Sequence, residues 1–185
     1  MDDGEQFDQA IIFTIGHSNH GLKQFVTLLK DNSIDVVVDI RSRPYSRFAP
    51  HFNKAALQDS LHAHGIRYLF LGDKLGGRPG DRRFYDSEGH VLYARISETP
   101  EFHEGVESLV KGCNEYRLAL MCSEENPLNC HRYLLVGKFL EERGIAVIHI
   151  RGDGSQQSEK ELVRENKAYI NTEKQQNFFP QQGGE

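Results

Sequence analysis

The chain has 185 residues, enough for one domain with an ordinary hydrophobic core. Its 22 basic and 27 acidic residues give a formal net charge of −5, so no overall basic field attracts nucleic acid, and only local basic clusters are candidates for binding phosphate. The three spread-out cysteines do not suggest a disulfide framework, no apolar run is long enough for a membrane span, and the acidic start is unlike a signal peptide. We therefore expect a soluble, cytoplasmic protein with reduced thiols.

Short apolar runs alternate with amphipathic runs along most of the chain. The expected strands cover 11–15, 35–40, 66–71, 118–121 and 145–150. The expected helices cover 22–29, 53–64, 99–113 and 131–143, with a further helix over 159–170. Thr99 and Pro100 are typical of a helix start, Gly65 and Gly144 are typical of helix ends, and 72–97 is predicted to be a loop.

This alternation predicts an α/β fold. We expect a single domain with a mostly parallel five-strand sheet and helices on both faces, a three-layer sandwich of the Rossmann-like or flavodoxin-like kind. The predicted divisions are an N-terminal extension over 1–10, the α/β domain over 11–170 and a polar C-terminal tail over 171–185. Phe178 and Phe179 in that tail are predicted to dock, onto this molecule or a partner.

Ligands of open parallel sheets bind at the carboxyl ends of the strands. The loops expected at that edge carry five arginines and two cysteines, whereas the loops at the other edge are plainer. Guanidinium groups suit phosphate or carboxylate because they donate paired hydrogen bonds. The predicted substrate-binding residues are Ser18, Arg41, Arg43, Arg47, Gly76, Gly77, Arg78 and Arg132.

The stretch from Cys122 to Arg132 is the densest in reactive side chains. Cys130 is expected near a helix N-terminus, where the helix field would lower the pKa of its thiol. The candidate catalytic residues are Cys122, Cys130, His131, His17, Asp39 and Glu124. Each also has a structural interpretation: a free cysteine is often a small buried hydrophobe, and Asp39 can fix its loop by pairing with an arginine. Cys113 is expected to be structural.

A metal centre is an alternative interpretation of the same residues. Cys122, Cys130, His131 and His17 could converge on a zinc or iron ion, but the Cys-x7-Cys-His spacing is not a recognised zinc pattern. We therefore predict no metal site and no cofactor. The sequence also lacks a Walker phosphate loop, a nucleophile elbow and a full dinucleotide fingerprint.

Several short motifs together resemble a known family. They are Thr14-Ile-Gly-His-Ser18, Val38-Asp-Ile-Arg-Ser-Arg-Pro44, Leu75-Gly-Gly-Arg78, Leu120-Met-Cys-Ser-Glu124, Cys130-His-Arg132 and Val147-Ile-His-Ile150. This combination is similar to the uncharacterised bacterial and archaeal family catalogued as domain of unknown function 488, over about 12–150. The resemblance implies a compact α/β domain of unassigned activity. Many members carry a tryptophan between the Gly-Gly-Arg loop and the fourth helix; this chain has none, and Tyr85 or Tyr93 would fill that place.

Three functions follow from these residues. The favoured one is an enzyme whose arginines bind an anionic substrate, a nucleotide or nucleic-acid phosphate, with Cys122 or Cys130 as nucleophile and His17 or His131 transferring a proton. The alternatives are a non-catalytic nucleotide or nucleic-acid binding module and a metal-dependent enzyme with cysteine and histidine ligands. We expect an anionic small molecule or a nucleic acid as the partner, and no membrane.

Overall fold

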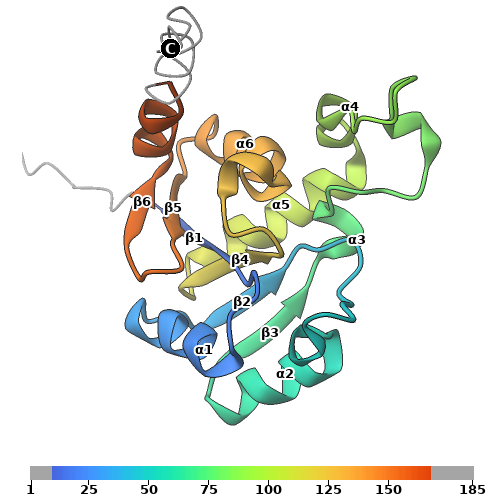
Figure 1. The fold of residues 1–185 in the computed structure, drawn as a ribbon. Coiled ribbons are helices and arrows are strands. Elements are labelled where there is room, and N and C mark those ends of the chain that lie inside the picture. The colour runs from blue at the N-terminus through green and yellow to red at the C-terminus, as the bar shows by residue number, and fades with distance from the viewer. Residues whose placement is uncertain (1–9, 168–185) are drawn as a thin grey trace, which may run out of the picture.

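The computed structural model describes residues 10–167, which form an α/β sandwich around one sheet (Figure 1). The strands are β1 (Ile11–Gly16), β2 (Val36–Asp39), β3 (Arg67–Phe70), β4 (Leu118–Cys122), β5 (Ala146–Ile150) and β6 (Gln156–Ser158). In this described part of the chain the sheet order is β3-β2-β4-β1-β5-β6. The first five strands are parallel, and β6 pairs antiparallel with β5. The predicted fold class is thus confirmed.

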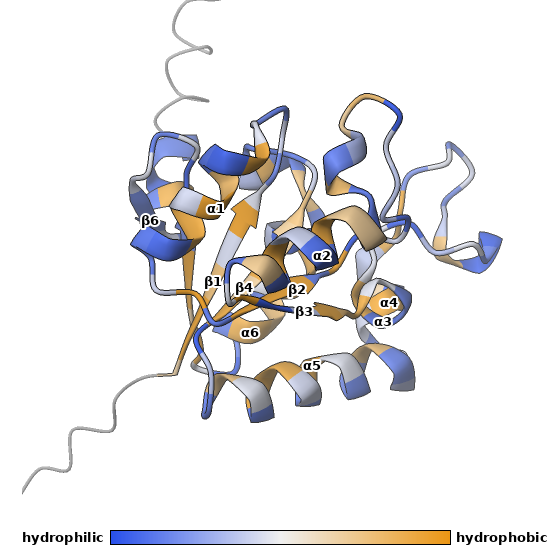
Figure 2. Cartoon of the chain, turned by 90° about the horizontal axis from the view of Figure 1, so that it is seen from below, coloured by the Kyte–Doolittle hydropathy of each residue, from blue (hydrophilic) through white to orange (hydrophobic). Residues whose placement is uncertain are grey.

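Helices cover both faces of the sheet, as Figure 2 shows. They are α1 (Leu22–Asp31), α2 (Lys54–Ala63), α3 (Gly72–Leu75), α4 (Tyr93–Ser97), α5 (Pro100–Cys113) and α6 (Lys138–Glu141). Helices α1 and α2 pack on one face, and α3 to α6 contribute to the core on the other. Because successive strand residues point to opposite faces, Ile12 enters one core and Phe13 the other. Burial on both faces explains why the central strands are mostly apolar.

The helix ends follow the local signals in the sequence. The Thr99 hydroxyl accepts a hydrogen bond from the Phe102 backbone N–H (3.2 Å), and Pro100 is the first residue of α5. Gly65 and Gly144 follow α2 and α6 with positive φ angles of 77° and 76°. These predictions are confirmed, because capping depends on residues that are neighbours in sequence.

Three details differ from the expected elements. Strand β6 was not predicted, since three polar residues carry no apolar pattern. The expected loop over 72–97 contains α3, α4 and a short 3₁₀ helix at Arg82–Phe84. The expected helix over 131–143 is divided into a π-helical turn, η4 (Arg132–Gly137), and α6. Such π-helical turns are frequent at functional sites.

The sheet topology brings three loops together at one edge. Strands β2, β4 and β1 are adjacent and parallel, with Gly16 beside Cys122 and Asp39 beside Met121 in the register. All three carboxyl ends therefore meet at the same place, although the loops that follow them are far apart in sequence.

At the C-terminal end, a helix runs over 159–167 to the limit of the described residues. The predicted tail over 171–185, with Phe178 and Phe179, lies outside them, as do residues 1–9 of the predicted extension. Within the described part of the chain, none of the helices combines the length and apolar character needed to span a membrane.

Candidate functional site

A cleft of about 460 Å³ opens at the carboxyl ends of β2 and β4. Its volume is in the range of ordinary ligand pockets. The loops after β2, β3 and β4 form its walls, together with the segment that precedes η4. The lining residues are Arg41, Ser42, Arg43, Tyr45, Gly77, Arg78, Pro79, Tyr85, Tyr93, Cys122, Ser123, Glu124, Asn129, Cys130 and His131.

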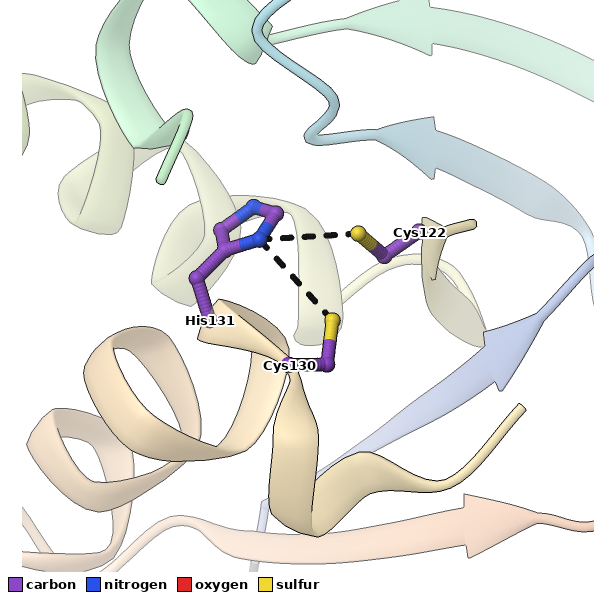
Figure 3. A group of neighbouring side chains, drawn as sticks. All are labelled: Cys122, Cys130 and His131. Atoms are coloured by element: carbon purple, nitrogen blue, oxygen red, sulfur yellow. Dashed lines mark hydrogen bonds between the residues drawn. The ribbon is translucent and has the colours of Figure 1, made fainter. Parts of the chain in front are cut away.

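Two thiols and an imidazole meet in the cleft wall. Cys122 is the last residue of β4, whereas Cys130 and His131 immediately precede η4. Their exposed fractions are only 4%, 2% and 8%, so they lie deep in the wall. The His131 Nδ1 is 3.5 Å from the Cys122 Sγ and 3.8 Å from the Cys130 Sγ (Figure 3). We call Cys122, Cys130 and His131 the thiol–imidazole cluster.

The other ring nitrogen of His131 fixes its orientation. The Nε2 lies 2.8 Å from the Ile40 carbonyl oxygen, which can only accept a hydrogen bond, so Nε2 carries a proton. In the neutral ring Nδ1 then presents a lone pair to the two sulfur atoms. Gly77 packs directly against His131, and a Cβ atom at this position would collide with the ring. The His131 ring is thus held from two sides.

Glu124 extends the thiol–imidazole cluster into the cleft. The Cys122 thiol donates a hydrogen bond to Glu124 Oε2 (3.0 Å). Partial burial would raise the pKa of Glu124, but hydrogen bonds from Cys122, from the backbone and from Cys130 outweigh it and lower that pKa below its usual value. This carboxylate is therefore an ionised acceptor beside the two thiols.

The pKa of Cys130 differs from the sequence prediction. The hydrogen bond with Cys122 and burial raise the pKa of the Cys130 thiol instead of lowering it. The helix field was expected to dominate, but a neighbouring sulfur and the loss of solvent act at shorter range. The surroundings of Cys130 thus favour the protonated thiol, contrary to the predicted lowering of its pKa by the helix field.

Asp39, Arg41 and His17 form a buried network beside the cleft. The Arg41 guanidinium donates to both Asp39 carboxylate oxygens (2.9 and 2.6 Å), and the Tyr68 hydroxyl donates to the same carboxylate (2.7 Å). Arg41 Nη1 also lies 3.2 Å from His17 Nε2 and must be the donor. Asp39 is completely buried and is absent from the cleft lining, whereas Arg41 reaches the lining.

His17 is not brought into the thiol–imidazole cluster. Its Nε2 accepts from Arg41, its Nδ1 donates to the Ser18 carbonyl (2.9 Å), and its ring stacks on Phe52 at 4.3 Å. Burial, with a further contribution from the Arg41 charge, lowers the pKa of His17 to about 4. With both nitrogens engaged, His17 is placed to support Arg41.

Arg132 is fully buried and does not line the cleft. Its guanidinium donates to the Thr14 hydroxyl (3.1 Å) and to the carbonyls of Glu124 (3.0 Å) and Glu125. Burial lowers the pKa of Arg132, against the opposing influence of the two cysteines. Arg132, the first residue of the π-helical turn, thus anchors the loop that contains Glu124.

The remaining predicted binding residues divide into two groups. Arg43, Arg78 and Gly77 line the cleft, and both arginines are exposed. Gly76 lies behind them, where a Cβ atom would collide with the Gly72 carbonyl and the Ser42 side chain. Ser18 and Arg47 lie outside the cleft lining; the Ser18 backbone N–H donates to the Ser123 carbonyl, and Arg47 is exposed.

Several lining residues were not predicted from the sequence. Tyr45 lies 69% exposed on the loop after β2, and the Ser42 hydroxyl accepts from the Arg78 backbone N–H (2.9 Å). For Tyr45, the signal available in the sequence was an aromatic residue two positions after Arg43. Tyr85 and Tyr93, which the family resemblance singled out, both line the cleft.

The side-chain chemistry allows two roles for this arrangement. The arginines can bind an anion, and the thiol–imidazole cluster can act on that anion or hold a metal ion. The Sγ, Sγ and Nδ1 atoms of the cluster all lie within 4.8 Å of one another. Of the four ligands considered from the sequence, the structure brings these three together and leaves His17 out.

Comparison with known proteins gives a family but no activity. No curated protein and no solved structure matches the chain. A family model described as Domain of unknown function DUF488 matches residues 21–140, which include the loop with Arg41 and Arg43, the Gly-Gly-Arg loop and the thiol–imidazole cluster. The chain therefore belongs to this family of unknown function.

Proposed function

We propose that this protein is an enzyme that acts on a phosphate-bearing substrate, with a nucleotide as the substrate class. The observation that carries the proposal is the shared cleft: cationic side chains and the thiol–imidazole cluster line the same cavity. A substrate anion bound by the arginines would lie beside the groups able to react with it.

Arg43 and Arg78 have the properties of anion-binding residues. Both are exposed, and neither forms an ion pair with a carboxylate in the described part of the chain. The nearby Arg83, by contrast, pairs with Asp81. A guanidinium without a carboxylate partner keeps its donors available for a phosphate.

The tyrosines support a nucleotide over a simple phosphate ester. Tyr45, Tyr85 and Tyr93 line the cleft, and aromatic rings bind nucleobases by stacking. The proposal thus assigns the phosphate to the arginines and the base to the tyrosines.

A non-catalytic nucleotide-binding module is the second candidate. The raised pKa of Cys130 favours it, because a neutral thiol is a poor nucleophile. The two candidates share the binding residues and differ only in whether the thiol–imidazole cluster changes the substrate.

Calorimetry with nucleoside monophosphates and the matching nucleosides tests the binding part. We expect the monophosphate to bind more tightly, and Arg78→Gln to weaken its binding about tenfold, roughly 1.4 kcal/mol. Arg82→Gln is the matched control, because Arg82 is exposed nearby and does not line the cleft. Equal binding of nucleoside and nucleotide by the wild-type protein would contradict the proposal.

Incubation with those nucleotides and chromatography of the products tests the catalytic part. We expect the wild-type protein to convert at least one nucleotide, and Cys122→Ser to bind that nucleotide without converting it. Binding with no conversion by the wild-type protein would favour the non-catalytic module.

A further inference from the structure

The thiol–imidazole cluster has the composition and spacing of a metal site. Its atoms come from both ends of the loop between β4 and η4, and Figure 3 shows both sulfur atoms directed toward the same nitrogen of His131. The single lone pair on Nδ1 faces both sulfur atoms, and the Cys122 sulfur also lies 3.0 Å from Glu124 Oε2. A shared cation would satisfy all three atoms at once.

The distances agree with tetrahedral coordination. Zinc–sulfur bonds of about 2.3 Å and zinc–nitrogen bonds of about 2.0 Å, at tetrahedral angles, place sulfur and nitrogen about 3.5 Å apart. The observed separations from His131 Nδ1 are 3.5 Å for Cys122 and 3.8 Å for Cys130. Both sulfur–nitrogen separations are thus close to those of a tetrahedral site, and the two sulfur atoms lie within 4.8 Å of each other.

The surrounding groups suit ligands of this kind. Histidines that bind a metal usually donate their other N–H to a carbonyl or carboxylate, as His131 does to Ile40. The Arg132 backbone N–H points at the Cys130 sulfur at 3.5 Å, a contact that stabilises a thiolate. The fixed ring and the supported sulfur are present before any ion binds.

We propose that Cys122, Cys130 and His131 bind a zinc ion, with its fourth coordination position open to the cleft. Two thiolates and an imidazole are ligands that select zinc over magnesium or calcium. Three protein ligands and an open position are typical of catalytic rather than structural zinc sites. Glu124, whose Oε2 lies 3.0 Å from the Cys122 sulfur, would be the carboxylate beside such an ion and could serve as a general base there.

The zinc site does not depend on the proposed substrate. The ion would bind whether the cleft accepts a nucleotide or another molecule, and its test needs no substrate. Failure of nucleotide binding would therefore leave the zinc site standing, and failure of zinc binding would leave the arginine cleft standing.

The experiment uses the full chain, stripped with a chelator and then reconstituted with zinc or cobalt(II). We expect about one zinc per chain after dialysis, and a near-ultraviolet charge-transfer band from thiolate-bound cobalt. Cys122→Ser and Cys130→Ser should weaken or remove that band. Cys113→Ser is the matched control: Cys113 is the remaining cysteine of the chain, its thiol donates to the Val110 carbonyl, and the band should persist.

A thermal-unfolding measurement on the wild-type protein guards against variants that fail to fold. Zinc should raise the melting temperature of the stripped protein, because it binds the folded state. Magnesium at the same concentration should not. The proposal is overturned if stripped wild-type protein gives no thiolate–cobalt band, or if the band survives in Cys130→Ser as it does in Cys113→Ser.

Discussion

Arg41, Arg43, Arg78 and Arg132 come from segments that meet at one edge of the sheet, and the fold uses them in two ways. Arg41 and Arg132 are 4% and 0% exposed and hold neighbouring loops through hydrogen bonds. Arg43 and Arg78 are exposed on the cleft. One pair of arginines thus fixes the loops around the cleft, and the other pair supplies the cationic side chains that line it. The difference lies in the partners that surround each guanidinium.

The two buried arginines also differ from each other. Arg41 pairs with the Asp39 carboxylate, whereas the partners of Arg132 are a hydroxyl and two carbonyls. A buried carboxylate left without its cation costs more than a carbonyl left without a donor. Replacing Arg41 should therefore destabilise the protein more than replacing Arg132.

Arg41→Met is expected to have the largest effect. It leaves the Asp39 carboxylate fully buried without its cation and should lower the free energy of unfolding by about 3–5 kcal/mol. Urea unfolding followed by circular dichroism measures the loss. Adding Asp39→Asn should recover part of it, because the uncompensated charge is removed. A loss below about 1 kcal/mol would mean that Arg41 is no more important to stability than an exposed arginine.

Arg132→Met should lower the free energy of unfolding by less, about 2–3 kcal/mol, because it leaves only neutral acceptors without their donor. The released loop carries Glu124, so the cleft should also become more mobile. Urea unfolding gives the energy, and hydrogen exchange at residues 123–126 reports the mobility. A larger loss of unfolding free energy in Arg132→Met than in Arg41→Met would contradict the cost assigned to the unpaired Asp39 carboxylate.

Glu159 is a buried acid that forms no ion pair with any residue in the described part of the chain. It is 7% exposed, its Oε2 has no hydrogen-bond partner among the described residues, and burial together with the Glu141 charge raises its pKa to about 7, against the opposing charge of Lys138. The folded state then retains a proton that the unfolded state loses above its pKa of 4.5. The resulting stability is complete below about pH 4.5 and is lost as the pH rises through about 7.

Glu159→Gln should remove this pH dependence. When the pH is raised from 5 to 8, the free energy of unfolding of the variant should rise by about 1 kcal/mol relative to that of the wild-type protein, after allowance for screening by solvent. Unfolding curves of both proteins at the two pH values provide the measurement. A constant difference between the proteins would show that Glu159 is ionised throughout this range.

Arg43→Gln and Arg78→Gln should have the smallest effects on stability, within about 0.5 kcal/mol, because both side chains are exposed and neither forms an ion pair with a described carboxylate. The weaker nucleotide binding expected of Arg78→Gln would then reflect lost contacts with the ligand. A large drop in melting temperature would instead assign these arginines to the framework.

Much of the fold was predictable from local sequence. The strands at Ile11–Gly16 and Leu118–Cys122 are short apolar runs, and Thr99 and Gly144 mark helix ends by rules that involve adjacent residues. Strand β6 was missed because its three polar residues become a strand only by pairing with β5. The π-helical turn was missed for a similar reason, since nothing in the apolar spacing distinguishes it from an α-helix.

For the candidate site, the sequence by itself determined which residues are near the sheet edge. Cys122, Cys130 and His131 were grouped correctly because they belong to one strand–loop–helix segment. Only the tertiary structure decided how deep each side chain lies. It placed Arg132 beneath the 124–125 loop, turned His17 toward Arg41 and exposed Tyr45. The burial of a side chain depends on atoms from distant segments of the chain, and its charge and pKa depend on that burial. The loops after β1, β2 and β4 come together only when the sheet has formed.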